Sequence, residues 1–144
     1  MIAEEAGVDV VTEDLMAVQQ LYGRQSHAID SGRAADWADT FTVDGEFHSP
    51  SYPQPAVGSD GLTAFAERFH AVCVESGEVL RHVVSTVEVR DAGPDALTCE
   101  AYLQIVGTPR GGDSRLHRIT TIVDDMVRTP DGLRIRRRTV LRDD

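Results

Sequence analysis

The chain lacks the features that mark several specialised classes of protein. Only two cysteines, Cys73 and Cys99, occur in 144 residues, so buried free thiols are expected rather than a disulfide or a metal site. No apolar run approaches the roughly 20 residues that are needed to span a bilayer. The first eleven residues, MIAEEAGVDVV, are acidic and lack the basic region and long apolar stretch of a signal peptide, which favours a cytoplasmic protein.

Lysine is absent, and all fourteen basic residues are arginine. Against 24 acidic residues they leave a formal net charge of −10. Nucleic acid is therefore not an expected partner, because phosphate binding needs a dense basic face. Four arginines gather in the last strand pattern, and we expect them on an exposed face, paired with acids. They are Arg134, Arg136, Arg137 and Arg138.

The remaining composition is typical of a globular protein. The chain has 41% hydrophobic and 26% charged residues. Its length predicts a single domain over residues 1–144. A domain of this size buries roughly two-thirds of the surface that its unfolded chain exposes. Residues 1–11 are predicted to form a loose arm.

The first half of the chain is predicted to be mostly helical. In chain order the patterns indicate a helix over 12–30, a short helix over 34–41, a short strand over 45–49, a proline-rich loop over 49–58 and a helix over 60–76. Thr12 is the candidate N-cap of the first helix and Ser59 or Asp60 that of the last. The pair Ser31-Gly32 ends the first helix.

The second half alternates between extended segments and turns. Four strands are predicted, over roughly 79–91, 96–107, 115–128 and 133–142. Short turns join them, and Thr129-Pro-Asp-Gly132 is a hairpin turn. Helices followed by an antiparallel meander indicate an α+β fold, in which a curved sheet carries helices against one face.

Both faces of these strands are partly apolar. In the strand over 115–128, Ile122 and Met126 lie on one face, and Val123 and Val127 on the other. A sheet with helices on one side only should have a more polar outer face. We therefore expect the second face to pack against another copy of the chain in a two-fold dimer.

Several short motifs follow one another along the chain in a characteristic order. They are Ala-Ile-Asp30-x-Gly-x-x-x-x-Trp37, Phe41-x-x-Asp44-Gly-Glu-Phe, Arg81-His82 and Asp131-Gly-x-x-Ile135. Together they resemble the nuclear transport factor 2-like superfamily and, within it, the SnoaL-like branch. The resemblance implies an α+β cone: a curved, mixed or antiparallel sheet with three helices packed on its concave face. The superfamily includes dehydratases, isomerases, polyketide cyclases, epoxide hydrolases and binding modules, so the fold alone does not choose an activity.

Scytalone dehydratase has the most similar site pattern. The resemblance places its essential aspartate on Asp30, one pocket histidine on His82 and a pocket serine near Thr121. Two other pocket positions depart from that family. Its second histidine falls on Ala101, and a tyrosine that polarises the substrate falls on Phe47.

The residues themselves suggest an acid/base pair. Tyr22 and Asp30 are eight residues apart on one stripe of the first helix. Asp30 would accept a hydrogen bond from His82 and set its tautomer, while Tyr22 would donate to a substrate oxygen. Alternatively, Asp30 caps the turn that follows it.

Other side chains are candidates for the wall of a pocket. Phe65 is expected at the pocket mouth, whereas His48 and His117 are each pocket-facing in one of two possible orientations of their strands. The histidines do not have the spacing of metal ligands on one element, so no metal site is predicted.

Two functions remain open at this point. The first is a cofactor-free acid/base enzyme, a dehydratase, isomerase or cyclase, in which Asp30 and His82 act on a small apolar, polyketide- or terpenoid-like molecule. The second is a binding module without chemistry, or a small subunit beside a larger oxygenase. The retained aspartate and histidine favour the enzyme, and the two lost pocket residues favour the module.

Overall fold

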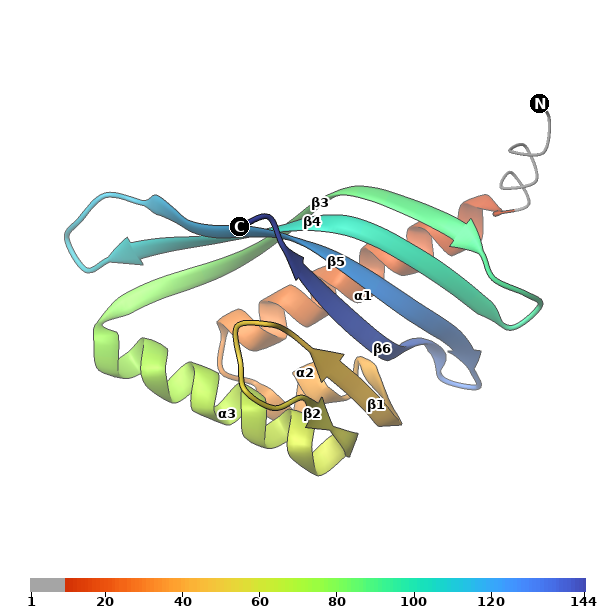
Figure 1. The fold of residues 1–144 in the computed structure, drawn as a ribbon, viewed down its shortest axis with the longest axis horizontal. Coiled ribbons are helices and arrows are strands. Elements are labelled where there is room, and N and C mark those ends of the chain that lie inside the picture. Colours follow the sequence, from red (N-terminus) through yellow and green to blue (C-terminus); the bar gives the residue numbers. More distant parts are fainter. Residues whose placement is uncertain (1–9) are drawn as a thin grey trace.

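The computed structural model describes residues 10–144, which form three helices and six strands (Figure 1). The helices are α1 (Thr12–Asp30), α2 (Ala34–Ala38) and α3 (Gly58–Ser76). The strands are β1 (Phe41–His48), β2 (Ala56–Val57), β3 (Glu78–Asp91), β4 (Ala96–Pro109), β5 (Arg115–Thr129) and β6 (Gly132–Arg142). The expected loose arm falls mostly on residues 1–9, which lie outside the described residues.

All six strands join one mixed sheet in the order β2-β1-β6-β5-β4-β3. β1 runs parallel to β6, and every other neighbouring pair is antiparallel. The register shifts between Ser85 and Glu88 in β3 and between Asp125 and Met126 in β5. Because such irregularities bend a strand and increase its twist, the sheet curls instead of lying flat.

The helices cover the concave side of the curled sheet, so the predicted α+β cone is confirmed (Figure 1). α1 crosses behind the strands and packs against β3 and β6. Its buried residues recur every three or four positions and include Val18, Leu21 and Ile29. α3 packs against α2 and β1 and ends at Gly77, whose φ of 69° is the left-handed conformation that favours glycine.

Some predicted boundaries were wrong. The second helix ends at Ala38, because the carbonyl of Thr40 already accepts a hydrogen bond from the Ile135 amide and draws the chain into the sheet. The loop contains a strand that was not predicted, β2, in which Val57 pairs with Glu46. Since the chain leaves β2 directly into α3, Val57 occupies the N-cap position and no side chain caps that helix. Val11 likewise takes the place expected for Thr12.

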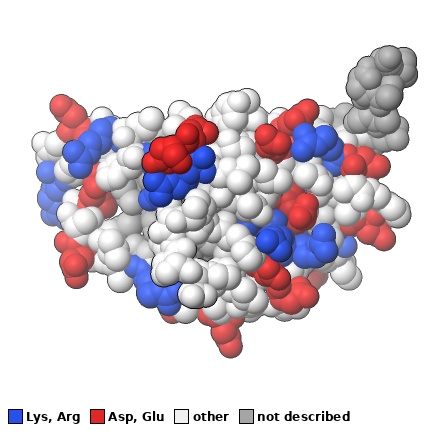
Figure 2. All heavy atoms as spheres, viewed as in Figure 1, with Lys and Arg blue, Asp and Glu red and all other residues white. Residues whose placement is uncertain are grey.

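The two surfaces of the sheet differ in how they are covered. The concave face carries buried Leu97, Cys99, Ile122 and Met126. The convex face leaves large apolar side chains exposed, Tyr102 by 45% among them. On the face drawn in Figure 2, acidic and basic residues are interspersed, and neither sign gathers into one patch.

Candidate functional site

An internal cavity lies between the helices and the concave face of the sheet. Its empty volume is about 540 Å³, including the space open to solvent at its mouth. Eight lining residues are apolar: Ile29, Trp37, Phe47, Phe65, Phe69, Leu103, Ile105 and Val140. Six are polar: Ser49, Tyr52, His82, Arg118, Thr120 and Arg138. A largely apolar lining with a few convergent polar groups is typical of a site for a small organic molecule.

Aromatic rings form one side of the cavity around Phe65. Its ring stacks on Trp37 with 5.6 Å between centroids and lies 4.8 Å from the ring of Phe47. The ring of Tyr52 meets Phe65 edge-on at 4.9 Å. These rings come from α2, β1, α3 and the loop after β1, so the wall exists only once those elements have packed together.

Asp30 and His82 meet at the edge of the cavity. Asp30 is the last residue of α1, and His82 lies near the start of β3, against which α1 packs. His82 Nδ1 is 2.7 Å from Asp30 Oδ1, and the backbone N–H of His82 donates to both carboxylate oxygens at 3.1 and 3.2 Å. The carboxylate is therefore held by ring and backbone together, with 7% of its side chain exposed.

This contact decides which ring nitrogen of His82 is available. When Asp30 is ionised, Nδ1 carries the hydrogen that the carboxylate accepts, and the neutral ring then leaves a lone pair on Nε2. Nε2 has no hydrogen-bond partner among residues 10–144, and the ring lines the cavity, edge-on to Phe69 at 5.3 Å. A nitrogen arranged in this way can accept a proton from a bound molecule and later return it.

Tyr22 lies away from the cavity, which corrects the expectation that it donates to a substrate. Its hydroxyl donates to Asp124 Oδ2 at 2.7 Å, and the residue is 3% exposed. Burial, followed by the charge of Asp124, raises the pKa of the Tyr22 phenol far above its usual value. Tyr22 therefore remains a neutral donor in the interior of the fold.

The same carboxylate pairs with Arg138, which was expected on an exposed face. Nε and Nη2 of Arg138 donate to the two oxygens of Asp124 at 2.8 and 2.9 Å, and Nη2 also donates to Gln25 Oε1 at 2.8 Å. Burial alone lowers the pKa of Arg138, but the charge and hydrogen bonds of Asp124 outweigh it and the net pKa is raised. The buried guanidinium thus stays charged.

An extra residue in β6 shifts the alternation of its side chains and explains why Arg138 points inward. Ile135 and Val140 are both buried, although an odd separation of five residues places them on opposite faces of a regular strand. The irregularity in the pairing with β5, between Asp125 and Met126, absorbs the extra residue. The odd spacing of the two apolar residues was the signal in the sequence for this inward turn.

The remaining sequence-based candidates divide between the cavity and other places. Phe47 and Phe65 line the cavity. His48 contacts Glu46 at 2.7 Å, and His117 contacts Glu78 at 2.8 Å, so neither ring lines it. His48 points away because alternate residues of a strand face opposite sides of the sheet. His117 is the extra residue where the pairing of β4 with β5 is irregular, and its ring lies over Gly107 beside Glu78.

Two further candidates lie outside the cavity lining for different reasons. Ala101 is completely buried in the core and does not line the cavity. Thr121 lies on the convex face, while its neighbour Thr120 lines the cavity. The expected pocket hydroxyl on β5 is therefore one residue earlier than the resemblance placed it.

Sequence reasoning missed the polar residues at the mouth. Tyr52 belongs to the proline-rich loop, which has no periodicity from which an orientation could be derived. Arg118 Nη1 donates to Ser51 Oγ at 2.7 Å and ties that loop to β5. Burial raises the pKa of the Tyr52 phenol, although the charge of Arg118 opposes the shift, so Tyr52 is a protonated donor at the cavity.

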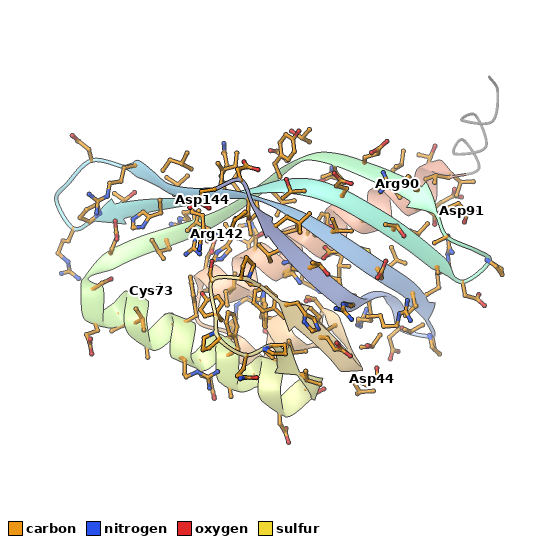
Figure 3. All side chains as sticks on the ribbon, in the orientation of Figure 1. Asp44, Cys73, Arg90, Asp91, Arg142 and Asp144 are labelled. Atoms are coloured by element: carbon orange, nitrogen blue, oxygen red, sulfur yellow. The ribbon has the colours of Figure 1, made fainter. Side chains whose placement is uncertain are left out.

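The cysteines contribute nothing to this cavity. Cys99 is buried in the core, and Cys73, labelled on α3 in Figure 3, lines a separate hollow; both are free thiols. Within residues 10–144, no group of three or more histidine, cysteine, aspartate or glutamate side chains is placed to hold a metal ion. No helix in the same residues is long and apolar enough to cross a membrane.

A curled, unclosed sheet around an internal cavity, with helices on its concave side, defines the nuclear transport factor 2-like class of proteins. The chain belongs to the SnoaL-like domain family, because the sequence model of that family matches residues 10–139. A search of curated proteins gives no match.

Solved structures of similar proteins agree with this assignment. ActVI-ORFA from Streptomyces coelicolor is 30% identical over 92% of this chain and 98% of its own, with a TM-score of 0.82. A protein from Catenulispora acidiphila in complex with S-DNPA is 30% identical over 88% of this chain and 90% of its own, with a TM-score of 0.76. An NTF2-like protein with a cystatin-like fold from Novosphingobium aromaticivorans is 24% identical over 91% and 83%, with a TM-score of 0.79.

Proposed function

We propose that this protein is a cofactor-independent acid/base enzyme that moves a proton on a small apolar molecule. One observation carries the proposal. The ring of His82 lines an apolar cavity while Asp30 holds Nδ1 at 2.7 Å, which leaves Nε2 as the proton acceptor. Dehydration, double-bond isomerisation and cyclisation all begin with such a transfer, so the proposal covers a lyase or an isomerase.

The chemical step needs only groups that are already present. His82 Nε2 takes a proton from a carbon beside a carbonyl. The electron pair of the broken C–H bond forms the new C–C double bond, and the π pair of the carbonyl moves onto oxygen. Asp30 stabilises the resulting imidazolium through the hydrogen bond to Nδ1. In an isomerisation the same proton returns at another carbon; in a dehydration it leaves with the departing hydroxyl as water.

The cavity wall supports a ring-containing substrate. Trp37, Phe47 and Phe65 present aromatic surface, which packs well against flat rings. A structurally similar protein from Catenulispora acidiphila was solved with the small molecule S-DNPA. We therefore propose a polyketide- or terpenoid-like substrate of a bacterial secondary pathway, handled in the cytoplasm.

A binding module, or a small subunit of an oxygenase, remains the second candidate function. It is favoured by one observation: His82 is the only histidine among the cavity-lining residues in the described part of the chain. Ala101, where a second histidine would stand in scytalone dehydratase, is buried in the core. In this case the cavity would bind a ligand without reacting with it.

Deuterium exchange into 2-tetralone, a bicyclic ketone, separates the two functions. We expect the protein to accelerate exchange at the carbon beside the carbonyl in D₂O, as followed by NMR. His82→Gln should lower the rate by about 10²–10⁴-fold, the usual contribution of a general base. The control His27→Gln removes an exposed histidine of α1. Equal rates for wild type and His82→Gln would overturn the enzyme proposal.

We also propose that a second copy of the chain covers the convex face in a two-fold dimer. Cross-strand pairs join Tyr102 to Thr121 and Thr121 to Leu141, so apolar surface continues across β4, β5 and β6. Tyr102 and Leu141 are 45% and 48% exposed in the single chain. Light scattering should give a dimer for the wild type and a monomer for Tyr102→Asp. Val43→Asp, on β1, is the control, and a monomeric wild type at micromolar concentration contradicts the proposal.

A further inference from the structure

Arg138 is a polar group of the cavity that the proposed proton transfer does not use. Its side chain lines the cavity although it is only 6% exposed. Asp124 accepts hydrogen bonds from Nε and Nη2 of the guanidinium, and Gln25 accepts a second hydrogen bond from Nη2. Neither Asp124 nor Gln25 lines the cavity, so both hold the arginine on the side away from the cavity.

The remaining nitrogen, Nη1, is the one that the cavity can reach. A guanidinium has five N–H donors, and the three contacts of Arg138 use those on Nε and Nη2. Nη1 has no partner among residues 10–144. Within the same residues, every enclosed side-chain nitrogen or oxygen has a hydrogen-bond partner. Since Nη1 has none, it is not enclosed, and the space it faces is the cavity.

The charge of the cavity indicates what Nη1 would bind. The described residues that line it include Arg118 and Arg138 but no aspartate or glutamate. Arg118 is tied to Ser51 at the mouth, whereas the network around Arg138 is buried. A charged donor in apolar surroundings forms its strongest hydrogen bonds with an oxygen that carries negative charge.

We infer that Arg138, through Nη1, binds an oxygen of the ligand that carries or develops negative charge, such as a phenolate or an enolate oxygen. The inference rests on the proposed function, because an enolate forms when His82 removes a proton beside a carbonyl. Arg138 would hold that oxygen at the moment when it becomes anionic, which is the role of an oxyanion-stabilising group.

The positions of the two residues also bear on the size of the ligand. His82 is on β3 and Arg138 on β6, with β5 and β4 between them. Three strand spacings amount to roughly 14 Å on a flat sheet, a distance that the curl and the length of both side chains reduce. A two-ring molecule has the length to contact both residues at once, so the experiment uses bicyclic probes.

Binding of 2-naphthol and 2-methylnaphthalene tests the inference. 2-Naphthol resembles the enol of 2-tetralone, and 2-methylnaphthalene has a methyl group in place of the hydroxyl. Calorimetry should show that the wild type binds 2-naphthol at least about tenfold more tightly, as expected for one hydrogen bond to a charged group. The absorbance of bound 2-naphthol should show a larger naphtholate fraction than in buffer at the same pH.

Two variants assign the preference to Arg138. Arg138→Lys keeps a charge for Asp124 but has only one nitrogen, which cannot also reach the cavity. The double variant Asp124→Asn/Arg138→Gln removes both charges together, so that no buried charge is left alone. In each, the preference for 2-naphthol should fall to less than about twofold. The control is Arg137→Gln, because Arg137 is the preceding residue and its side chain is 50% exposed. This variant should keep the preference for 2-naphthol.

The outcomes separate this inference from the proposed function. If 2-methylnaphthalene binds and 2-naphthol has neither a binding advantage nor an increased naphtholate fraction, the inference is overturned and the cavity still binds apolar rings. If neither probe binds, both fail. A preference that persists in either Arg138 variant, with a melting transition to show that it is folded, also overturns the inference. The wild-type absorbance decides the question even where a variant does not fold.

Discussion

Two of the polar contacts between helix α1 and the sheet are mostly buried, and they differ in how completely their groups are partnered. Midway along the helix, Tyr22 and Gln25 join Asp124 and Arg138, whose side chains are 0% and 6% exposed. At the end of the helix, Asp30 holds His82, at 7% and 15% exposure, and Nε2 is left open to the cavity. The first contact is nearly saturated, and the second has a free reactive atom.

The comparison separates a contact that serves stability from one that the proposed function assigns to chemistry. The attraction within a buried ion pair does little more than offset the cost of removing both charges from water. Removal of one partner leaves the other charge buried without a counter-charge, which is strongly destabilising. The pair at the end of α1 keeps one basic nitrogen next to an apolar space, where a proton can be exchanged with a ligand. Changes at Tyr22 or Asp124, which do not line the cavity, should therefore act on stability, and changes in the second contact on turnover.

The largest effect is expected on catalysis, from Asp30→Asn. The amide keeps the shape of the carboxylate but cannot stabilise the imidazolium of His82, so the rate of deuterium exchange into 2-tetralone should fall by about 10²–10⁴-fold. The loss of stability should stay near 1–2 kcal/mol, because the amide oxygen can still accept one hydrogen bond. Near wild-type exchange in Asp30→Asn would remove the carboxylate from the mechanism.

Asp124→Asn should have the largest effect on stability. It leaves the Arg138 guanidinium buried without its counter-charge, and breaking such a pair costs about 3–5 kcal/mol. Urea unfolding followed by circular dichroism measures the loss, with Asp30→Asn as the matched aspartate. If the two variants lose the same stability, the proposed division of roles between the two contacts is incorrect.

Tyr22→Phe tests the buried contact around Asp124 and Arg138 without removing a charge. The variant lacks the hydroxyl that donates to Asp124 at 2.7 Å, and loss of a hydrogen bond to a charged group costs about 1.5–3 kcal/mol. Because Tyr22 does not line the cavity, binding of 2-methylnaphthalene should be unchanged. Calorimetry and urea unfolding of the same preparation check the two halves of the prediction, and weakened binding with intact stability contradicts it.

The smallest effect, counted per pH unit, is expected at alkaline pH. Burial, followed by the charge of Asp124, raises the pKa of Cys99 from 9.0 to about 12. The unfolded state therefore loses this proton first, so the stabilisation is complete below pH 9 and is lost as the pH rises toward 12. The free energy of unfolding should fall by at most about 1.4 kcal/mol per pH unit through this thiol.

Cys99→Ala isolates that contribution. Between pH 9 and 11, its unfolding free energy should fall less steeply than that of the wild type, since only the raised pKa values of Tyr22, Tyr52 and Cys73 then act. Parallel curves for the two proteins would show that Cys99 titrates alike in the folded and unfolded states, contrary to this prediction.

Local patterns in the chain were sufficient to predict most of the secondary structure. The recurrence of Val18, Leu21 and Ile29 at helical spacing indicated the buried stripe of α1, which the structure confirms. The four long strands were placed to within two residues of their ends. Such features depend on neighbours within a few residues, and a sequence displays those directly.

Asp30 and His82 were also predictable, but for a different reason. They fall in motifs whose order resembles a known family, and neither periodicity nor composition would have joined two residues 52 positions apart. The packing of α1 against β3 brings them together. The family resemblance thus supplied a long-range contact that local reasoning could not.

The other polar groups of the site depend on tertiary structure alone. Arg138 points inward because the register between β5 and β6 shifts, and Tyr52 reaches the cavity because its loop is tied to Arg118. A one-residue slip moves every later side chain of a strand to the opposite face. The sequence therefore defined the elements and, through its motifs, one hydrogen-bonded pair, Asp30 and His82. Strand register and loop packing, which depend on contacts distant in the chain, decided which further side chains face the ligand.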